Sequence, residues 1–420
     1  MPDDHLVFFL SDLVETLDLS AIHATYSEER GQPPYHPLLM VKILLYGYAR
    51  GIFSSRKLAR ACQEDVAFRV LCAENQPDFR TISDFRKRHL QALSELFLQV
   101  LRLCQRAGMV KLGHVAIDGT KIKANASKHK AMSYARMQEE EKRLKKEIAK
   151  LMRESERTDR AEDHLYGADQ RGDELPEELA HRESRLKKIQ EAKSALEAEA
   201  RAAAVEAGVD EAQLDEVEPE PKAQRNFTDP ESRIMPAAGK AFVQAYNAQA
   251  AVDYGSQVIV AAEVTECSSD RRQLVPMVEQ ACENLEETPE IFSADAGYWV
   301  EEDLQTLEGY EIDALVAPDK IRHREWREQE ILALPVPDGL SCRERMRYLL
   351  KTAPGRAEYT KRMSSVEPVF GQLKQARGFR QFLLRGKDKV RSEWKLVCTG
   401  HNLLKLFNFS RDKRLAPHPA

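Results

Sequence analysis

The sequence predicts an α/β protein in which a domain of mixed sheet and flanking helices follows an all-helical N-terminal domain. Residues 1–107 carry apolar side chains at helical spacing, and short apolar runs alternate with helical patterns from residue 226 onward. Between them, residues 132–222 are dense in Glu, Lys and Arg. We therefore expect a helical domain at 1–107, an α/β domain made of 111–131 and 223–415, and an inserted helical hairpin at 132–222.

Three helices are predicted in the N-terminal domain. Pro37 begins the run PLLMVKILLYGYARG, which Gly51 ends. A second helix is expected over SSRKLARACQEDVAFRVL and a third, long one over RTISDFRKRHLQALSELFLQVLRLCQRAGM. The first two resemble a helix-turn-helix, in which Arg56, Lys57 and Arg60 would contact DNA phosphates. A plain helical bundle with solvated Arg and Lys is the alternative.

Two strands of the α/β domain are predicted to end in a carboxylate. The stretch HVAIDGTKIKANA begins as an apolar strand and reaches Asp118, and the run PEIFSADAGYW reaches Asp295 in the same way. The other elements expected are a hairpin of 242–252 and 258–264 around the turn DYGS, a helix capped by Asp270, a strand in GYEIDALVAPD, and helices across 356–411.

The inserted segment has the pattern of an antiparallel helical hairpin that resembles a coiled coil. Its two apolar stripes are Leu144, Ile148 and Leu151, and Leu179, Leu186, Ile189 and Leu196. The stretch LYGADQRGDELP interrupts the pattern between them. Its charges are expected to be solvated, so we expect this hairpin to serve assembly or partner contact and not chemistry.

The net charge of -5 hides a strong asymmetry along the chain. Residues 137–220 hold 15 Lys and Arg against 25 Asp and Glu, a balance of -10, so the rest of the chain is at +5. Residues 356–395 hold 11 basic and 4 acidic residues, a balance of +7. A local basic stripe of this kind is typical of proteins that bind nucleic-acid phosphates.

Export, membrane insertion and a disulfide framework are not expected. The chain has no apolar run of 18 residues, and the N-terminus MPDDHLVFFLSDLVETL is acidic before its apolar patch. Seven cysteines are widely spread without a CxxC pair, which favours reduced thiols in a cytoplasmic protein. The histidines show no HxH or HxxxH spacing, so zinc is not expected either.

A third carboxylate joins Asp118 and Asp295 from a strongly basic helix. In YTKRMSSVEPVFGQLKQARGF, the spacing brings Arg362, Glu367 and Lys374 near one helical side. Three carboxylates suit Mg²⁺, which prefers oxygen ligands, and two such ions can activate a nucleophile and stabilise a leaving oxygen at a phosphodiester. The cations would offset the repulsion between carboxylates and DNA.

Simpler interpretations of the first motif remain open. An Asp after a strand often begins a turn, and Lys121 and Lys123 can be solvated instead of contacting DNA. The triplet DGT also occurs in phosphatases of the haloacid dehalogenase type. Those enzymes need a nucleophilic Asp two residues before Asp118, where this chain has Ala116.

Taken together, these motifs resemble DDE transposases of the IS4/IS5 insertion-sequence superfamily, and most closely the IS1182 group. The resemblance covers nearly the whole chain, through HVAIDGTKIKANAS, DPESRIM, AYNAQAAVD, SADAGYW and YTKRMSSVEPVFGQLK. It implies an RNase H-like fold in which Asp118, Asp295 and Glu367 bind the metal ions. Four residues separate Arg362 from Glu367, where the superfamily pattern has three.

The resemblance also implies partners and an activity. Tyr359, Arg362 and Lys374 would hold DNA near the cut, with two Mg²⁺ ions as cofactors and Mn²⁺ as a possible substitute. The enzyme would cut the transposon ends and join the released 3′ hydroxyl to target DNA, as a homodimer on DNA in the bacterial nucleoid. An RNase H-like nuclease that never joins strands, or a DNA-binding protein that has lost catalysis, are the alternatives.

Overall fold

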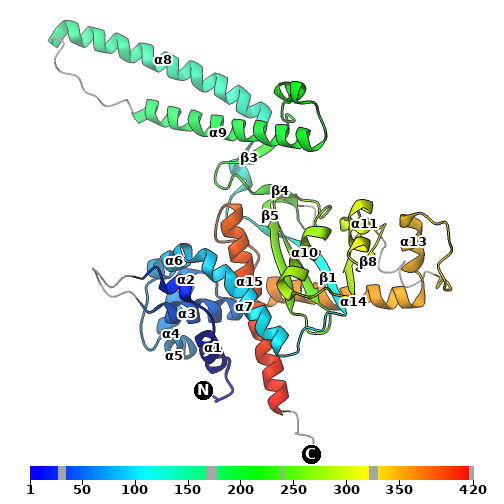
Figure 1. The fold of residues 1–420 in the computed structure, drawn as a ribbon. Helices are drawn as coiled ribbons and strands as arrows, with labels where there is room; N and C mark the ends of the chain where they lie inside the picture. Colours follow the sequence, from blue (N-terminus) through cyan, green and yellow to red (C-terminus); the bar gives the residue numbers. More distant parts are fainter. Residues whose placement is uncertain (27–34, 167–176, 238–240, 321–329, 416–420) are drawn as a thin grey trace, which may run out of the picture. The chain divides into compact units, whose positions relative to one another are not determined.

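The computed structural model forms two compact units (Figure 1). The first unit contains residues 1–124 and 245–420, and the second contains residues 125–244. The residues that the structure describes are 1–26, 35–166, 177–237, 241–320 and 330–415. The three domain boundaries expected from the sequence stay a prediction.

The N-terminal part of the first unit is helical, as predicted. Its helices are α1 (Leu6–Glu15), α2 (Ser20–His23), α3 (Pro37–Arg50), α4 (Ser55–Glu64), α5 (Val66–Leu71), α6 (Phe79–Arg88) and α7 (Leu90–Arg106). Helix α3 begins at Pro37 and ends before Gly51, whose φ of 80° is the left-handed conformation that glycine adopts readily. Both predicted ends of this helix are confirmed.

Two predicted helices are each divided into two. The expected helix over residues 54–71 breaks at Asp65, whose carboxylate accepts hydrogen bonds from the N–H groups of Ala67 and Phe68 and so begins α5. The expected helix over residues 80–109 breaks at His89, between α6 and α7. A capping side chain at Asp65 offers the backbone an alternative to continuing the helix.

The strands of the first unit form a mixed sheet in the order β6-β5-β1-β7-β8. Its strands are β1 (His114–Lys123), β5 (Phe242–Asp253), β6 (Ile259–Thr265), β7 (Ile291–Ala294) and β8 (Asp313–Val316). The predicted hairpin is β5 and β6, which pair antiparallel. Strand β1 lies between β5, to which it is antiparallel, and β7, to which it is parallel. The α/β class is therefore confirmed.

Helices cover this sheet and tie it to the N-terminal helices (Figure 1). They are α10 (Leu274–Leu285), α11 (Glu301–Gly309), α13 (Cys342–Leu349), α14 (Ala353–Gly371) and α15 (Lys387–Leu415), with a π-helical turn at Gln372–Ala376. Helix α14 packs on β1 and β7, and α15 packs on α7, α3 and β6. The side chain of Trp394 on α15 is fully buried in this core.

The second unit contains the predicted helical hairpin. Its elements are a 3-10 turn at Lys128–Lys130, β2 (Ala131–Ser133), α8 (Tyr134–Tyr166), α9 (Glu177–Glu206), a 3-10 turn at Glu211–Glu216, β3 (Gln224–Asn226) and β4 (Arg233–Pro236). Ion pairs from Glu141 to Lys193 and from Glu147 to Arg182 show that α8 and α9 run antiparallel.

The apolar stripes predicted in this hairpin meet only in part. Leu144, Ile189 and Leu196 are buried together, whereas Ile148 and Leu151 are half-buried. Leu186 packs against the edge of the cluster. The side chain of Leu179 and most of the stretch LYGADQRGDELP lie outside the described residues.

Two expectations about the whole chain concern membranes and cysteines. In the described parts of the chain, the structure contains no helix with the length and apolarity needed to cross a membrane. The cysteines are all free thiols, and four of them are buried, namely Cys62, Cys72, Cys104 and Cys398.

Candidate active site

The prediction that two strands end in a carboxylate is confirmed for Asp295, which directly follows β7, and is wrong for Asp118, which lies inside β1 because the strand continues to Lys123 and pairs with β5 there. Strands β1 and β7 run parallel, with Ala116 beside Ser293. Two residues further along each strand, this register places Asp118 beside Asp295, and both side chains leave the sheet on the same face. Neighbouring strands lie about 4.8 Å apart, so the two carboxylates share one edge region of the sheet.

Burial dominates the electrostatics of Asp118. Its side chain is 22% exposed, and one carboxylate oxygen accepts a hydrogen bond of 2.8 Å from the N–H of Gly119. The pKa of Asp118 is raised to about 7, mainly by burial; the charge of Arg362 opposes this shift and the nearby charge of Asp295 adds to it. Asp118 therefore holds its proton far more readily than an exposed Asp.

Asp295 is fixed by the turn that follows β7. It is the N-cap of a short 3-10 helix, Ala296–Tyr298, and its Oδ1 accepts a hydrogen bond of 2.7 Å from the N–H of Gly297. A capping carboxylate leaves one oxygen committed to the backbone and the other available. Tyr298, at the end of this turn, is fully buried.

Helix α14 brings Glu367 to Asp118 through an arginine. Arg362 lies 3.6 Å (Nη1) from Oδ2 of Asp118 and 3.7 Å (Nη2) from Oε1 of Glu367. Its guanidinium also lies over the ring of Tyr359, 5.7 Å from the centroid. The Nε of Arg362 is buried and has no hydrogen-bond partner among the described residues. The predicted set of Tyr359, Arg362 and Glu367 therefore meets Asp118 at one place.

Lys374 reaches the same place from the turn after α14. It lies in the π-helical turn Gln372–Ala376, and its Nζ donates a hydrogen bond to Oγ1 of Thr120. Thr120 and Asp118 are two residues apart on β1, so their side chains leave the strand on the same face. Burial lowers the pKa of Lys374, and the charge of Asp118 opposes this shift.

Among the described residues, the remaining cations predicted to contact DNA form no hydrogen bond or ion pair with Asp118, Asp295 or Glu367, although the charge of Lys121 adds to the burial that lowers the pKa of Lys374. Lys121 Nζ lies 3.2 Å from Oδ1 of Asp270, and Lys123 is exposed. On α4, Arg56 stacks on the ring of Phe79 at 4.9 Å, and the exposed Lys57 and Arg60 follow, with Arg60 bound to Glu64 at 2.8 Å. Phosphate contact by these five cations stays a prediction.

The predicted helix cap at Asp270 is wrong. Helix α10 begins at Leu274 after Gln273, which makes no side-chain cap. The carboxylate of Asp270 instead accepts hydrogen bonds from Asn247 and Gln249 of β5. No local pattern signals this, because Asp270 and its partners are 21 and 23 residues apart in the chain.

The three carboxylates fit Mg²⁺ by their chemistry. All supply oxygen atoms, which this ion prefers, and Glu367 is 51% exposed, so its side chain has room to move. Within the described residues, no group of three or more His, Cys, Asp and Glu is arranged to hold a metal ion. The guanidinium of Arg362 bridges Asp118 and Glu367 here, and it would have to give up these contacts for both to bind an ion.

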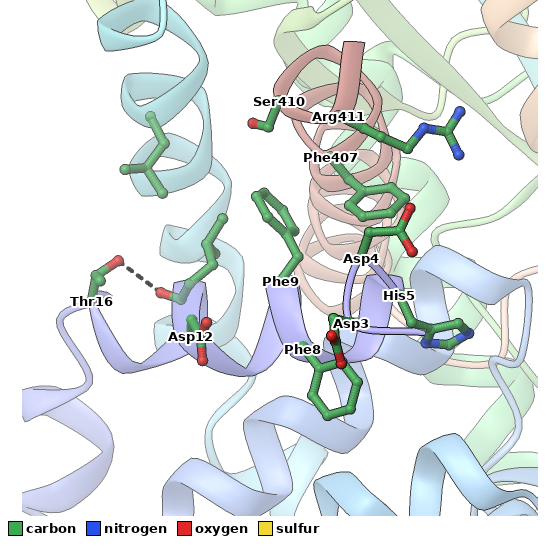
Figure 2. A pocket seen from close by; sticks show the side chains of 12 residues that line it. Asp3, Asp4, His5, Phe8, Phe9, Asp12, Thr16, Phe407, Ser410 and Arg411 are labelled. Carbon is green, nitrogen blue, oxygen red and sulfur yellow. Dashed lines mark hydrogen bonds between the residues drawn. The ribbon is translucent and has the colours of Figure 1, made fainter. Parts of the chain in front are cut away.

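A cavity of about 400 Å³ in the first unit contains none of these residues (Figure 2). Aromatic rings from α1 and α15 line it, and the ring centroids of Phe9 and Phe407 lie 5.4 Å apart. The side chains of Asp3, Asp4 and Asp12 also line the cavity. The cavity therefore gives no support to the predicted chemistry.

Comparison with known protein families gives two matches. The family described as Transposase domain (DUF772) matches residues 1–88, and the family described as Transposase DDE domain matches residues 337–407. The second match contains Tyr359, Arg362, Glu367 and Lys374, whereas Asp118 and Asp295 lie outside both. Neither the curated proteins nor the solved structures gave a match.

Proposed function

We propose that this chain is a transposase of the IS1182 type, which cuts the ends of an insertion sequence and joins them to target DNA; the matches of its residues 1–88 and 337–407 to two transposase domain families support this proposal. The observation that carries this proposal is that Arg362 bridges Asp118 and Glu367, while the register of β1 and β7 places Asp295 beside Asp118. The sheet order β5-β1-β7, with one acid on β1 and another directly after β7, supports an RNase H-like catalytic domain.

Each side chain has a defined task in this mechanism. Asp118 and Asp295 supply carboxylate oxygens from neighbouring strands, and Glu367 supplies a third from α14. Two Mg²⁺ ions bound there would stabilise the attacking and leaving oxygens of the phosphodiester. Burial favours the protonated form of Asp118, so its carboxylate would have to lose that proton in order to hold a cation.

The cations around the carboxylates hold the DNA backbone. Arg362 can exchange its contacts with Asp118 and Glu367 for a phosphate, to which a guanidinium binds with two parallel hydrogen bonds. Lys374 adds a second charge from the next turn, and Tyr359 orients Arg362 by stacking. On the N-terminal helices, Arg56, Lys57 and Arg60 would contact phosphates further along the duplex.

Transposition also requires two ends to be brought together. We therefore expect a homodimer on DNA, and the hairpin of α8 and α9 is our candidate for the contact between its subunits. Deleting residues 135–204 would then leave a monomer on DNA, which light scattering of the complex measures. A dimer that persists after the deletion would contradict this role for the hairpin.

The proposal is tested by incubating the protein with DNA that carries the element's ends. We expect cleavage in Mg²⁺ or Mn²⁺, followed by joining when a pre-cut end and a target duplex are supplied. Glu367→Gln should abolish both reactions while a gel shift shows that DNA binding remains. The matched control is Glu358→Gln on the same helix, because Glu358 contacts Lys361 and His114 and not the other acids.

The outcomes separate the candidate functions. Cutting without joining of the pre-cut end would favour a nuclease of the same fold. DNA binding that is unaffected by metal, with no cleavage in either ion, would favour a protein that has lost catalysis.

A further inference from the structure

A buried polar network lies on the opposite face of β1 from Asp118. Side chains of paired strand residues leave a sheet on the same face, and Gly119 pairs with Gln249 while Lys121 pairs with Asn247. Because side chains alternate between the two faces of a strand, Gly119 and Lys121 lie on the face of β1 opposite Asp118. Both amide side chains are fully buried, and Asp270 lies between them.

Asp270 is held by three donors. Its Oδ1 accepts hydrogen bonds of 2.7 Å from Nδ2 of Asn247 and 2.8 Å from Nε2 of Gln249. The ammonium of Lys121 lies 3.2 Å from the same oxygen. Hydrogen bonds to an ionised acceptor in a buried place are among the stronger ones, so the carboxylate fixes how both amides are oriented.

The orientation of Gln249 is passed on to the turn that carries Asp295. Because Nε2 of Gln249 donates to Asp270, its Oε1 is left as an acceptor, and the hydroxyl of Tyr298 donates to it. The main-chain oxygen of Gln249 is itself held by Nε1 of Trp394 at 2.9 Å. Tyr298 closes the short 3-10 helix whose first residue is capped by Asp295.

The space between Asp270 and Asp295 is just large enough for a glycine. A Cβ atom built on Gly297 would lie 2.9 Å from Oδ1 of Asp295 and 3.5 Å from Oδ2 of Asp270. On β1, the space beside Gly119 also has no room for a larger side chain, because a Cβ atom built on Gly119 would lie 2.4 Å from Oδ1 of Asp270. The network therefore packs directly against the backbone that presents both catalytic aspartates.

We propose that Asp270 is a positioning residue for Asp295, acting through the amide of Gln249 and the hydroxyl of Tyr298. This inference rests on the proposed function, because Asp295 matters here as a ligand of the metal ion. Asp270 itself contacts neither the ion nor DNA in this account. Its charge holds Gln249 in one orientation, Gln249 holds Tyr298, and Tyr298 holds the turn at which Asp295 caps the backbone.

The test measures Mn²⁺ binding to the protein–DNA complex, read from the paramagnetic resonance signal of free Mn²⁺. Asp270→Asn leaves one oxygen that can accept from both amides but removes the negative charge that strengthens these hydrogen bonds and attracts Lys121. Tyr298→Phe removes the donor to Gln249. We expect each change to weaken Mn²⁺ binding about 10-fold, which is typical when a partner of a metal ligand is lost. The double variant should lose no more than either single one.

The matched control is Asp253→Asn. Asp253 is a buried carboxylate on the same strand as Gln249, and it accepts hydrogen bonds from Ser256 at the far end. This variant should lower the free energy of unfolding and leave Mn²⁺ affinity unchanged, which separates positioning from a general loss of stability. Should Asp270→Asn fail to fold, Tyr298→Phe carries the same test alone.

Three results would overturn the proposal. One is wild-type Mn²⁺ affinity in both Asp270→Asn and Tyr298→Phe, and another is losses that add in the double variant. In both cases the wild type still binds Mn²⁺ and cleaves DNA, so the proposed function stands. A wild type that neither binds Mn²⁺ nor cleaves would overturn the proposed function and this inference together.

Discussion

Replacing Gly119 by alanine places a methyl group where three buried polar side chains already lie. The added Cβ would be 2.4 Å from Oδ1 of Asp270, 2.4 Å from Nε2 of Gln249 and 2.9 Å from Oδ1 of Asn247. Ordinary contacts of such atoms are roughly 1 Å longer, so the side chains must separate. Their hydrogen bonds of 2.7 and 2.8 Å to Asp270 would then lengthen or break.

Two effects should lower the free energy of unfolding of Gly119→Ala. Overpacking a core typically costs about 1–3 kcal/mol, and losing one hydrogen bond to a charged group costs about 1.5–3 kcal/mol. We therefore expect Gly119→Ala to lower the free energy of unfolding by about 3 kcal/mol. Metal-dependent cleavage should fall at least tenfold at a temperature where the variant is still folded, because Asp118 and the network behind Asp295 both move.

The assay is urea unfolding followed by tryptophan fluorescence, with cleavage measured in parallel. Gly113→Ala is the matched control, since the nearest atom to its added Cβ would be Oε2 of Glu290 at 3.9 Å. This control should change stability by less than about 0.5 kcal/mol. A Gly119→Ala protein as stable and as active as the control would refute the packing described for this network.

Three further predictions concern other parts of the first unit. Burial lowers the pKa of His401 to about 3, so the folded protein stays unprotonated there while the unfolded chain binds a proton below its ordinary pKa of 6.5. His401 should therefore lower the free energy of unfolding by about 1.4 kcal/mol per pH unit as the pH falls from 6.5 toward 3. Urea unfolding at several pH values should show that His401→Gln removes this contribution, and an unchanged pH dependence in the variant would contradict the prediction. Arg362→Lys should lower single-turnover cleavage at least tenfold with little change in DNA affinity, because an ammonium keeps the charge but cannot hold a phosphate by two parallel hydrogen bonds as a guanidinium does. Wild-type cleavage would argue against this role of Arg362. Asp65→Ala should lower the free energy of unfolding by about 1 kcal/mol, because it removes the cap that begins α5, and an unchanged urea midpoint would show that the cap is unimportant.

The sequence was most informative where chemistry and local pattern coincide. The strand of Asp118, the strand of Asp295 and the basic helix of Glu367 were all expected, and all three elements are present. Their meeting could not be derived from spacing alone. It depends on β1 lying beside β7, which is a choice of sheet order that local residues do not encode.

The failures have physical causes that can be named. Asp65 was overlooked as a cap because the apolar residues on both sides of it continue a helical pattern. Asp270 was assigned to the helix that follows, by the ordinary preference of Asp for N-caps. In the folded chain, two buried amides on β5 and the ammonium of Lys121 compete for its carboxylate, and these long-range contacts prevail over the local preference.

The central claim is that Asp118, Asp295 and Glu367 act together as the catalytic carboxylates of DNA cleavage. We would compare Mg²⁺-dependent cleavage of the element's ends by the wild type, by Asp295→Asn, and by Asp313→Asn as a control. Asp313 is exposed at the first position of β8, the neighbouring strand, so its loss should leave cleavage unchanged. We expect no cleavage by Asp295→Asn, with DNA binding retained. Equal cleavage by all three proteins would remove Asp295 from the active site and contradict the account.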